Sequence, residues 1–307
     1  MYNKNDFPQY LPKLNALYED LFSGGKGFRA RLIKMVSDSI HLDDKSILLL
    51  SQTIEFIHNA SLLHDDLVDR SHLRRGKPTA WLTYTPEYAV LAGDYLLARV
   101  MVNLSSHGNL KLVQYTAEMI SDLLEGEWIQ DSLVGDWNVK LDQLDQVHRL
   151  KTASLFKWCL KSPFYCRENY DEEVHQILSE LGDIIGLLFQ RGDDLLDFDI
   201  RNEEGKAVLG DLKSSYVNSF AAFLHEEISE STFEAFKNCK EMECVTKVVG
   251  AEVFKKRLHE FDKMNQEQID LYNHLLTDLE KILPDVEKDF FEDLKKLPAL
   301  LYWRRKK

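Results

Sequence analysis

The sequence predicts an all-α protein, and three observations lead to this fold class. Apolar residues recur three and four positions apart, as in the stretch from 54 to 67. Only seven prolines occur in 307 residues, and most of them are expected to mark the boundaries between helices. No alternating run of β-branched residues flanked by turn residues stands out, so a sheet is not expected.

Between the prolines, the apolar spacing predicts helices of three turns or more. The prolines stand at Pro8, Pro12, Pro78, Pro86, Pro163, Pro284 and Pro298. In chain order the expected helices span 43–70, 87–106, 110–132, 141–161, 171–199 and 213–228. The tail from 251 to 296 should add amphipathic helices rich in Lys and Glu. Neither a low-complexity linker nor a fixed repeat occurs, so we expect one domain over residues 1–307.

The composition is that of a folded protein outside the membrane. Hydrophobic residues make up 44% of the chain and charged residues 29%. No stretch approaches the roughly 20 uninterrupted apolar residues that span a bilayer. The first residues, MYNKNDFPQYLPKL, lack the apolar centre of a secretory signal. Four cysteines show neither CxxC spacing nor the density of a disulfide framework, so a cytoplasmic location is expected: Cys159, Cys166, Cys239 and Cys244.

The net charge of −13 argues against nucleic-acid binding, which needs basic surface to replace phosphate counterions. The last residues, YWRRKK, could meet anionic lipid, but a frayed basic tail is the simpler interpretation. At most peripheral contact with a membrane is therefore expected.

Two acidic clusters lie in similar apolar surroundings. HDDLVD at 64–69 and GDDLLD at 192–197 both contain the pattern DDxxD. Its six aspartates are Asp65, Asp66, Asp69, Asp193, Asp194 and Asp197. Carboxylates four residues apart share a helix face and repel one another, and an apolar setting strengthens that repulsion. A cation between them relieves it, and oxygen ligands without His or Cys favour Mg²⁺. The alternative is a solvated acidic face, which two matching clusters make less attractive.

Basic residues accompany these acids. GGKGFR at 24–29 places two cations beside glycines, and HLRRGKP at 72–78 follows the first acidic cluster. Arg binds phosphate oxygens through two parallel hydrogen bonds, and Lys acts as a point charge. Basic groups next to metal-binding carboxylates suit a diphosphate with magnesium, although a solvated basic turn is the plainer interpretation of either segment alone.

Taken in order, these motifs resemble the trans-isoprenyl diphosphate synthases over roughly residues 20 to 220. The matching segments are GGKGFR at 24–29, EFIHNASLLHDDLVD at 55–69, RRGKPT at 74–79, LAGDYLLA at 91–98, KTASLF at 151–156 and GLLFQRGDDLLD at 186–197. The resemblance implies the isoprenoid synthase fold, a single-domain antiparallel helical bundle around a central cavity, assembled as a homodimer. It also implies a reaction in which isopentenyl diphosphate elongates an allylic diphosphate such as farnesyl diphosphate.

The same resemblance implies roles for individual residues. Three Mg²⁺ ions per active site would be held directly by Asp65, Asp69 and Asp193. The other three aspartates, Asp66, Asp194 and Asp197, would support them, some through water. The allylic diphosphate would bind Arg74, Lys151 and Lys206, and isopentenyl diphosphate would bind Lys26, Arg29, His58 and Arg75. Thr152 and Gln190 would lie beside the reacting carbons.

Simpler explanations exist for three of these residues. His58 on an apolar helix could be a core histidine. Thr152 could hydrogen-bond its own helix backbone, and Gln190 could be a buried amide that bridges two helices.

Small residues below the first acidic cluster favour a long product. Ser61 and Ala60 lie about 6–7.5 Å below Asp65 along the helix. In short-chain members of the family a bulky aromatic at one of these places closes the cavity floor. Here the next obstruction is Ile57, about 12 Å down. A product longer than fifteen carbons is therefore expected, as in long-chain polyprenyl synthases, with geranylgeranyl diphosphate as the alternative.

Two departures from the family pattern bear on function. DLKSSYVNSF at 211–220 has Tyr216 where the family usually carries a second lysine. Arg191 replaces a usual aliphatic residue and could pair with an aspartate or contact phosphate. Two other functions therefore stay open: a non-catalytic subunit that tunes an active synthase, and a class I terpene cyclase. The two complete acidic clusters count against both.

Overall fold

The protein is almost entirely helical, as the sequence predicts. The computed structural model describes residues 7–23, 27–74, 76–200 and 208–303. The chain divides into two compact units, Met1–Ser121 with Lys157–His175, and Asp122–Phe156 with Gln176–Lys307. Whether these units behave as the single expected domain stays a prediction.

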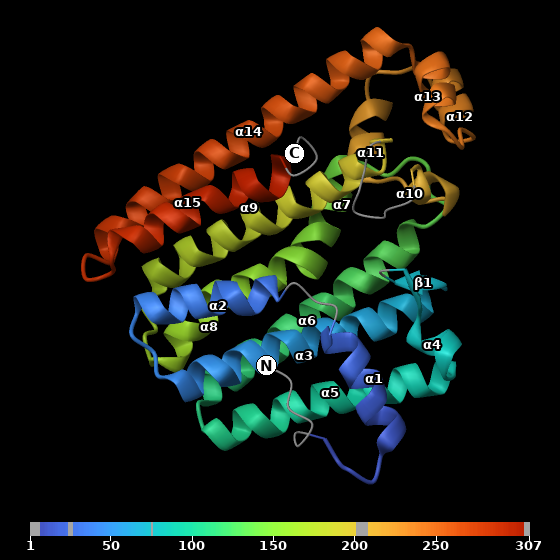
Figure 1. Cartoon of the computed structure of the whole chain (residues 1–307). Coiled ribbons are helices and arrows are strands. Elements are labelled where there is room, and N and C mark those ends of the chain that lie inside the picture. The colour runs from blue at the N-terminus through green and yellow to red at the C-terminus, as the bar shows by residue number, and fades with distance from the viewer. Residues whose placement is uncertain (1–6, 24–26, 75, 201–207, 304–307) are drawn as a thin grey trace. The chain divides into compact units, whose positions relative to one another are not determined.

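The first unit is built on a long buried helix, α3. Its helices are α1 (Pro12–Ser23), α2 (Phe28–Ser39), α3 (Asp44–Val68), α4 (Ala80–Thr83) and α5 (Pro86–His107). α3 begins at Asp43, whose carboxylate accepts hydrogen bonds from the backbone N–H groups of Lys45 and Ser46. It packs between α2 and α5 (Figure 1). At the contact with α5, a Cβ added to Gly93 would lie 2.3 Å from His64 Nε2, so only glycine allows this approach.

Three long helices contribute residues to both units. They are α6 (Leu110–Leu133), α8 (Ser154–Cys166) and α9 (Glu172–Leu196). α8 contains Pro163 in its interior, and α15 (Lys288–Tyr302) contains Pro298. The expectation that these two prolines mark boundaries between helices is therefore wrong. Each lies beyond the first turn of its helix, where a proline removes one backbone N–H donor from the helix.

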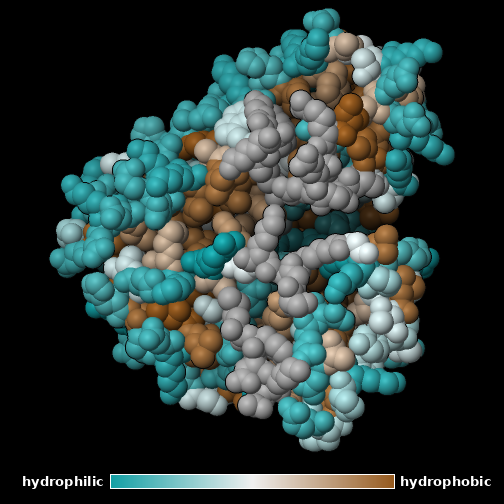
Figure 2. All heavy atoms as spheres, in the orientation of Figure 1, coloured by the Kyte–Doolittle hydropathy of each residue, from teal (hydrophilic) through white to brown (hydrophobic). Residues whose placement is uncertain are grey.

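The second unit contains the remaining helices. They are α7 (Leu141–His148), the π-helical segment η2 (Arg149–Ala153), α10 (Gly210–Lys213), α11 (Ser219–His225), α12 (Glu230–Phe236), α13 (Met242–Val249), α14 (Ala251–Ile282) and α15. α15 lies beside α14 (Figure 1). The buried residues of α14 recur at three and four, from Arg257 to Leu279, and hydrophilic residues cover its outer side (Figure 2). This confirms the amphipathic tail.

Four expectations differ from the structure. The helix expected over 141–161 is α7, η2 and the start of α8. The helix expected over 213–228 is wrong, because a turn with Ser215 at φ 57° separates α10 from α11. A two-residue hairpin, β1 (Leu73–Arg74) and β2 (Lys77–Pro78), stands where no strand was expected. Cys239 and Cys244 form a disulfide that closes a five-residue separation between α12 and α13.

Within the described residues, no helix is both long enough and apolar enough to cross a bilayer.

Candidate active site

The second acidic cluster ends α9 and is largely buried. Asp194 is 3% exposed and Asp197 is fully buried, whereas Asp193 is half-buried. The amphipathic sequence of α9 turns its apolar face to the core, and donors from other segments decide which carboxylates turn inward. Asp193 is therefore the member of the cluster that is most open to a ligand.

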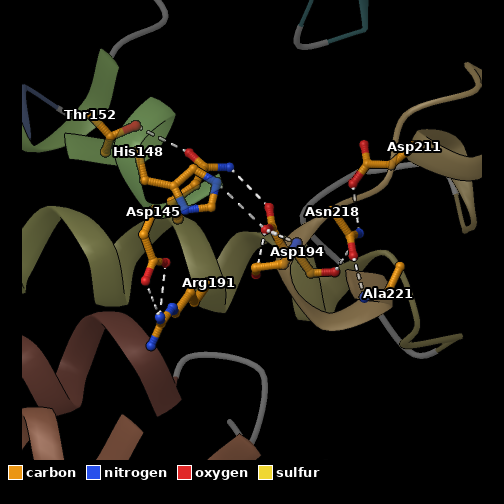
Figure 3. Close-up of polar contacts among 10 residues, drawn as sticks. Asp145, His148, Thr152, Arg191, Asp194, Asp211, Asn218 and Ala221 are labelled. Carbon is orange, nitrogen blue, oxygen red and sulfur yellow. Dashed lines mark hydrogen bonds and ion pairs between the residues drawn. The ribbon is translucent and has the colours of Figure 1, made fainter. Parts of the chain in front are cut away.

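Asp194 is held by hydrogen bonds on both oxygens (Figure 3). Its Oδ1 accepts from Gln190 Nε2 at 3.1 Å. Its Oδ2 accepts from the backbone N–H and the hydroxyl of Ser219, at 2.9 Å and 2.6 Å. His148 Nε2 lies 3.8 Å from the same oxygen. Asp194 thus acts as an anchor between three segments, which fits the supporting role expected of it.

Asp197 joins the end of α9 to α10. Its Oδ1 accepts hydrogen bonds from the backbone N–H groups of Gly210 and Asp211, at 2.8 Å and 3.3 Å. Its backbone carbonyl accepts from Leu209 N. Since the first N–H groups of a helix lack partners within the helix, a carboxylate placed there is stabilised. This role accounts for a fully buried aspartate.

The residues expected near the reacting carbons do come together. Thr152 Oγ1 donates to Gln190 Oε1 at 3.2 Å (Figure 3), and Lys151 forms an ion pair with Glu127 of α6. Thr152 bonds across to α9, so the interpretation of Gln190 as an amide that bridges two helices is supported too. Thr152 and Lys151 lie on η2, and such π-bulges are frequent at functional sites.

Two glycines allow this close packing. A Cβ on Gly186 would lie 2.3 Å from Ala153 Cα, and one on Gly126 would lie 2.7 Å from Lys151 Cγ. Both positions exclude any larger residue unless η2 moves. The backbone of α6 and α9 therefore fixes where Lys151 and Thr152 stand.

Burial also sets the charge of His148. The side chain is buried beside Asp194, and desolvation lowers its pKa, while the carboxylates of Asp194 and Asp145 oppose that shift. Desolvation is the larger effect, so the imidazole is neutral at neutral pH.

The first acidic cluster ends α3, in the other unit. Asp66 is 4% exposed and accepts hydrogen bonds from Arg74 on both oxygens, with distances of 2.7–2.9 Å. Asp65 is half-buried and Asp69 is exposed. Arg74 is thus bound to the acidic helix, and Asp65 and Asp69 are more exposed than Asp66.

The hairpin that carries Arg74 is fixed to the end of α3 through Ser71. The carbonyl of Ser71 accepts from Thr79 Oγ1 at 2.7 Å and from Trp81 Nε1 at 2.9 Å. Its N–H donates to the carbonyl of Asp66 at 2.9 Å. The short strands therefore hold the basic segment against the acidic cluster.

The other expected residues divide into described and undescribed ones. Arg29 on α2 and His58 on α3 are half-buried. Ile57 and Ala60 are buried, and half-buried Ser61 donates its hydroxyl to the carbonyl of His58 at 2.9 Å. Lys26, Arg75 and Lys206 lie outside the described residues.

Among the described residues, no three His, Cys, Asp or Glu side chains group closely enough to hold a metal ion alone. Carboxylate oxygens are donors that Mg²⁺ takes, alongside waters and substrate phosphates. Asp65 and Asp69 in the first unit and Asp193 in the second offer such oxygens on side chains that are not fully buried.

Sequence reasoning missed four residues of the site. His148, Asn218, Ser219 and Asp145 contact the second acidic cluster or its neighbours. Asn218 stands just before an apolar stretch, and an asparagine at such a place is a sequence signal for an N-cap. The pairing of Arg191 with an aspartate was one of two possibilities, and it is the one found.

Comparison with known proteins shows the family to which the chain belongs. A model of the family "Polyprenyl synthetase" matches residues 11–253. A prenyl transferase of Synechocystis sp. is 36% identical over 221 residues, covering 70% of this chain and 68% of that protein. An octaprenyl diphosphate synthase of Escherichia coli is 33% identical over 196 residues, covering 64% of this chain and 60% of that protein. The chain thus spans about two thirds of the relatives it matches.

A solved structure shares the fold over nearly its whole length. The crystal structure of a decaprenyl diphosphate synthase from Rhodobacter capsulatus matches with a TM-score of 0.82 and 25% sequence identity. The match covers 99% of this chain and 94% of that chain.

Proposed function

The chain belongs to the polyprenyl synthetase family, and from this premise we propose that it condenses isopentenyl diphosphate with an allylic diphosphate. The product is an all-trans polyprenyl diphosphate longer than fifteen carbons. The names of the relatives, octaprenyl and decaprenyl diphosphate synthase, support this length. The absence of a bulky side chain at Ala60 and Ser61 supports it as well.

One observation carries the proposal. Thr152, Gln190 and Asp194 form a continuous hydrogen-bonded chain (Figure 3), and the half-buried Asp193 directly precedes Asp194 in the sequence. A carboxylate kept accessible next to a buried, hydrogen-bonded one suits a metal-bound diphosphate rather than a core. The oxygens of an amide and a hydroxyl carry partial negative charge, which stabilises a carbocation that forms nearby.

We assign the metal as magnesium, with three ions per active site. Members of the family use a divalent metal. When bound, the ions neutralise the charge that develops on the leaving diphosphate. Asp65, Asp69 and Asp193 would hold them, and the buried oxygens of Asp194 keep the end of α9 in place.

The basic residues would bind the two diphosphates. Lys151 leaves Glu127, and Arg74 leaves Asp66, when each contacts the allylic diphosphate together with Lys206. The other diphosphate would be held by Lys26, Arg29, His58 and Arg75. Holding both substrates in line supplies much of the acceleration, since good positioning contributes about 7–11 kcal/mol to lowering a barrier.

The reaction needs no protein nucleophile. The allylic C–O bond breaks, and its electron pair leaves with pyrophosphate. The double bond of isopentenyl diphosphate attacks the allylic cation and forms the new C–C bond. A proton then leaves the adjacent carbon for the released pyrophosphate, which restores neutrality at carbon.

Three further proposals concern the whole protein. We expect a homodimer, farnesyl diphosphate as the allylic primer, and a cytoplasmic location with at most peripheral membrane contact. Apolar residues exposed on α5, such as Leu91 at 66% and Val102 at 49%, are consistent with a partner subunit.

A single assay separates this function from its alternatives. The purified chain is given magnesium and farnesyl diphosphate, with and without isopentenyl diphosphate, and the products are dephosphorylated and chromatographed. An elongated alcohol indicates a synthase, and a twenty-carbon one indicates geranylgeranyl diphosphate synthase. A hydrocarbon made without isopentenyl diphosphate indicates a cyclase, and no turnover supports the non-catalytic subunit.

A further inference from the structure

Arg191 is a charged residue in the core of the second unit. It stands between Gln190 and the second acidic cluster, and it is 3% exposed. A guanidinium buried to this degree is stable only when it is paired and hydrogen-bonded. Its partners therefore show what it holds together.

Those partners lie on two helices. Nη2 of Arg191 donates to both carboxylate oxygens of Asp145 on α7, at 2.8 Å each (Figure 3). Nη1 donates to Asn265 Oδ1 on α14, also at 2.8 Å. The guanidinium carbon lies 5.8 Å from the ring centroid of Phe261, on the same helix. Both Nη atoms of Arg191 are thus engaged by protein groups.

The contacts continue into the C-terminal helix. Asn265 Nδ2 donates to the hydroxyl of Tyr302 on α15 at 3.2 Å, and that hydroxyl donates to Asp262 at 2.8 Å. A Cβ added to Gly192 would lie 3.1 Å from the carbonyl oxygen of Leu301. The end of α15 thus packs directly on the backbone that leads into the acidic cluster.

On its other side, Arg191 belongs to a row of three contacts between α7–η2 and α9, which we call the seam: Asp145 with Arg191, His148 with Asp194, and Thr152 with Gln190. Asp145 meets Arg191, and three residues later His148 lies 3.8 Å from Asp194. Four residues after that, Thr152 bonds to Gln190. Spacings of three and four put these groups on one helical face. Arg191 makes the ionic contact of the seam, at the end away from Thr152.

We infer that Arg191 is a positioning residue that uses α14 and α15 to set the site. It clamps α7 onto α9 and so fixes η2, with Lys151 and Thr152, against Gln190 and Asp194. α15 and most of α14 lie beyond residue 253, where the family match ends. α15 and this part of α14 would thereby help to position the residues of the site. The inference rests on the proposed function, because it concerns the same site.

The test compares Arg191 with a second buried arginine of the same unit. Arg257 on α14 is 8% exposed and lies 3.7 Å from the Phe223 ring centroid. In the described part of the chain it pairs with Glu226 and Glu260, which are not residues of the seam. We compare Arg191→Leu, which introduces the usual aliphatic type, with Arg257→Leu and with Arg191→Lys. For each we measure Tm, kcat, KM and the Kd for pyrophosphate with magnesium by calorimetry.

Both leucine variants should lower Tm, but only Arg191→Leu should impair the site. Loss of a group that orients metal ligands typically weakens binding about 10- to 100-fold, and a misplacement of about 1 Å costs about 100-fold in rate. We expect kcat to fall by about 10- to 100-fold, with a smaller change in KM, and pyrophosphate to bind about tenfold more weakly. Arg191→Lys can still pair with Asp145, so its kcat and its Kd for pyrophosphate should lie between those of the wild type and those of Arg191→Leu.

If Arg191→Leu lowers Tm as Arg257→Leu does but keeps the wild-type kcat and Kd, the inference is overturned. Should Arg191→Leu not fold, Asn265→Ala and Tyr302→Phe test the same link from α14 and α15. Unchanged kcat in both would overturn it. A wild-type chain that binds pyrophosphate but elongates nothing would contradict the proposed function instead, and the Kd comparison would still report on Arg191.

Discussion

At the scale of single residues, Ala60 shows how burial shapes an expectation about product length. It is 0% exposed on α3, so a larger side chain must displace its neighbours and costs about 1–3 kcal/mol. Ser61, next along the helix, is half-buried and has more room. A larger side chain should therefore cost less stability at residue 61 than at residue 60.

We predict that Ala60→Tyr and Ser61→Phe both shorten the product by at least one isoprene unit. A ring below Asp65 would stop the growing chain. Radiolabelled products, dephosphorylated and separated by length, provide the measurement, with Tm as the control for folding. If both variants fold and make the wild-type length, the cavity floor is not at these residues.

His175 gives a prediction about pH. Burial lowers its pKa, and its Nε2 donates to the carbonyl of Asn169 at 2.8 Å, so the folded imidazole is neutral. The unfolded chain gains a proton below about pH 6.5. The contribution of His175 to the free energy of unfolding should therefore fall as the pH drops below about 6.5, and it should level off once the pH lies below the pKa of the folded state. Above about pH 6.5 this contribution should stay constant.

Urea unfolding at about pH 5.5 and about pH 7.5 measures this effect, and His175→Gln is the comparison. The variant should lose less stability than the wild type between the two conditions. Equal losses would mean that other groups account for the acid sensitivity.

The ordered motifs were enough to name the aspartates, Lys151, Thr152 and Gln190 as candidates, and Thr152, Gln190 and Asp194 are found in contact. What could not be predicted is which aspartate turns inward. Asp194 and Asp197 are buried because Ser219 and Gly210 donate to them from other segments. No spacing in the sequence encodes such contacts.

At the scale of elements, Asn218 joins a helix start to the active site. Its Oδ1 accepts from Ala221 N and so caps α11, and its Nδ2 donates to Asp211 at 2.9 Å (Figure 3). Ser229 caps α12 in the same way but lies away from the acidic cluster. The two form a matched pair of N-caps.

We predict that Asn218→Ala and Ser229→Ala each cost about 0.5–2 kcal/mol of stability, while only Asn218→Ala lowers activity. The loss of the first cap should release Ser219 from Asp194 and reduce kcat about tenfold or more. Chemical unfolding and steady-state kinetics test this. Equal kcat in the two variants would show that α11 does not support the site.

The disulfide between α12 and α13 makes a second prediction for elements. Under native conditions without reductant, an alkylating agent should label Cys166, which is half-buried, but not Cys159, which is buried with its pKa raised by desolvation. Cys239 and Cys244 should react only after reduction. Mass spectrometry reads the sites. Labelling of these two in the unfolded, unreduced chain would contradict the disulfide.

Long helices were predictable, and short ones were not. α3, α5, α6, α9 and α14 carry enough turns for their apolar spacing to stand out. Helices α10 to α13 have four to eight residues each, and such helices depend on tertiary packing and caps rather than on periodicity. The π-helical η2 likewise follows from packing against Gly186 and Gly126, which are far away in sequence.

At the scale of the whole molecule, the chain should self-associate. Leu91 and Val102 are large apolar residues exposed on α5, at 66% and 49%. We predict that sedimentation gives twice the chain mass of 35.7 kDa, and that Leu91→Asp shifts the protein toward the monomer. A wild-type protein that sediments at the monomer mass at micromolar concentration would contradict the homodimer.

The central claim is that both acidic clusters hold metal ions that draw a diphosphate from an allylic chain. The most direct measurement is a crystal structure grown with magnesium and a bisphosphonate. We predict magnesium ions on Asp65, Asp69 and Asp193 together with a bound bisphosphonate, and Asp194 still bonded to Ser219. Aspartates that bind no ion, with the bisphosphonate absent or elsewhere, would contradict the claim.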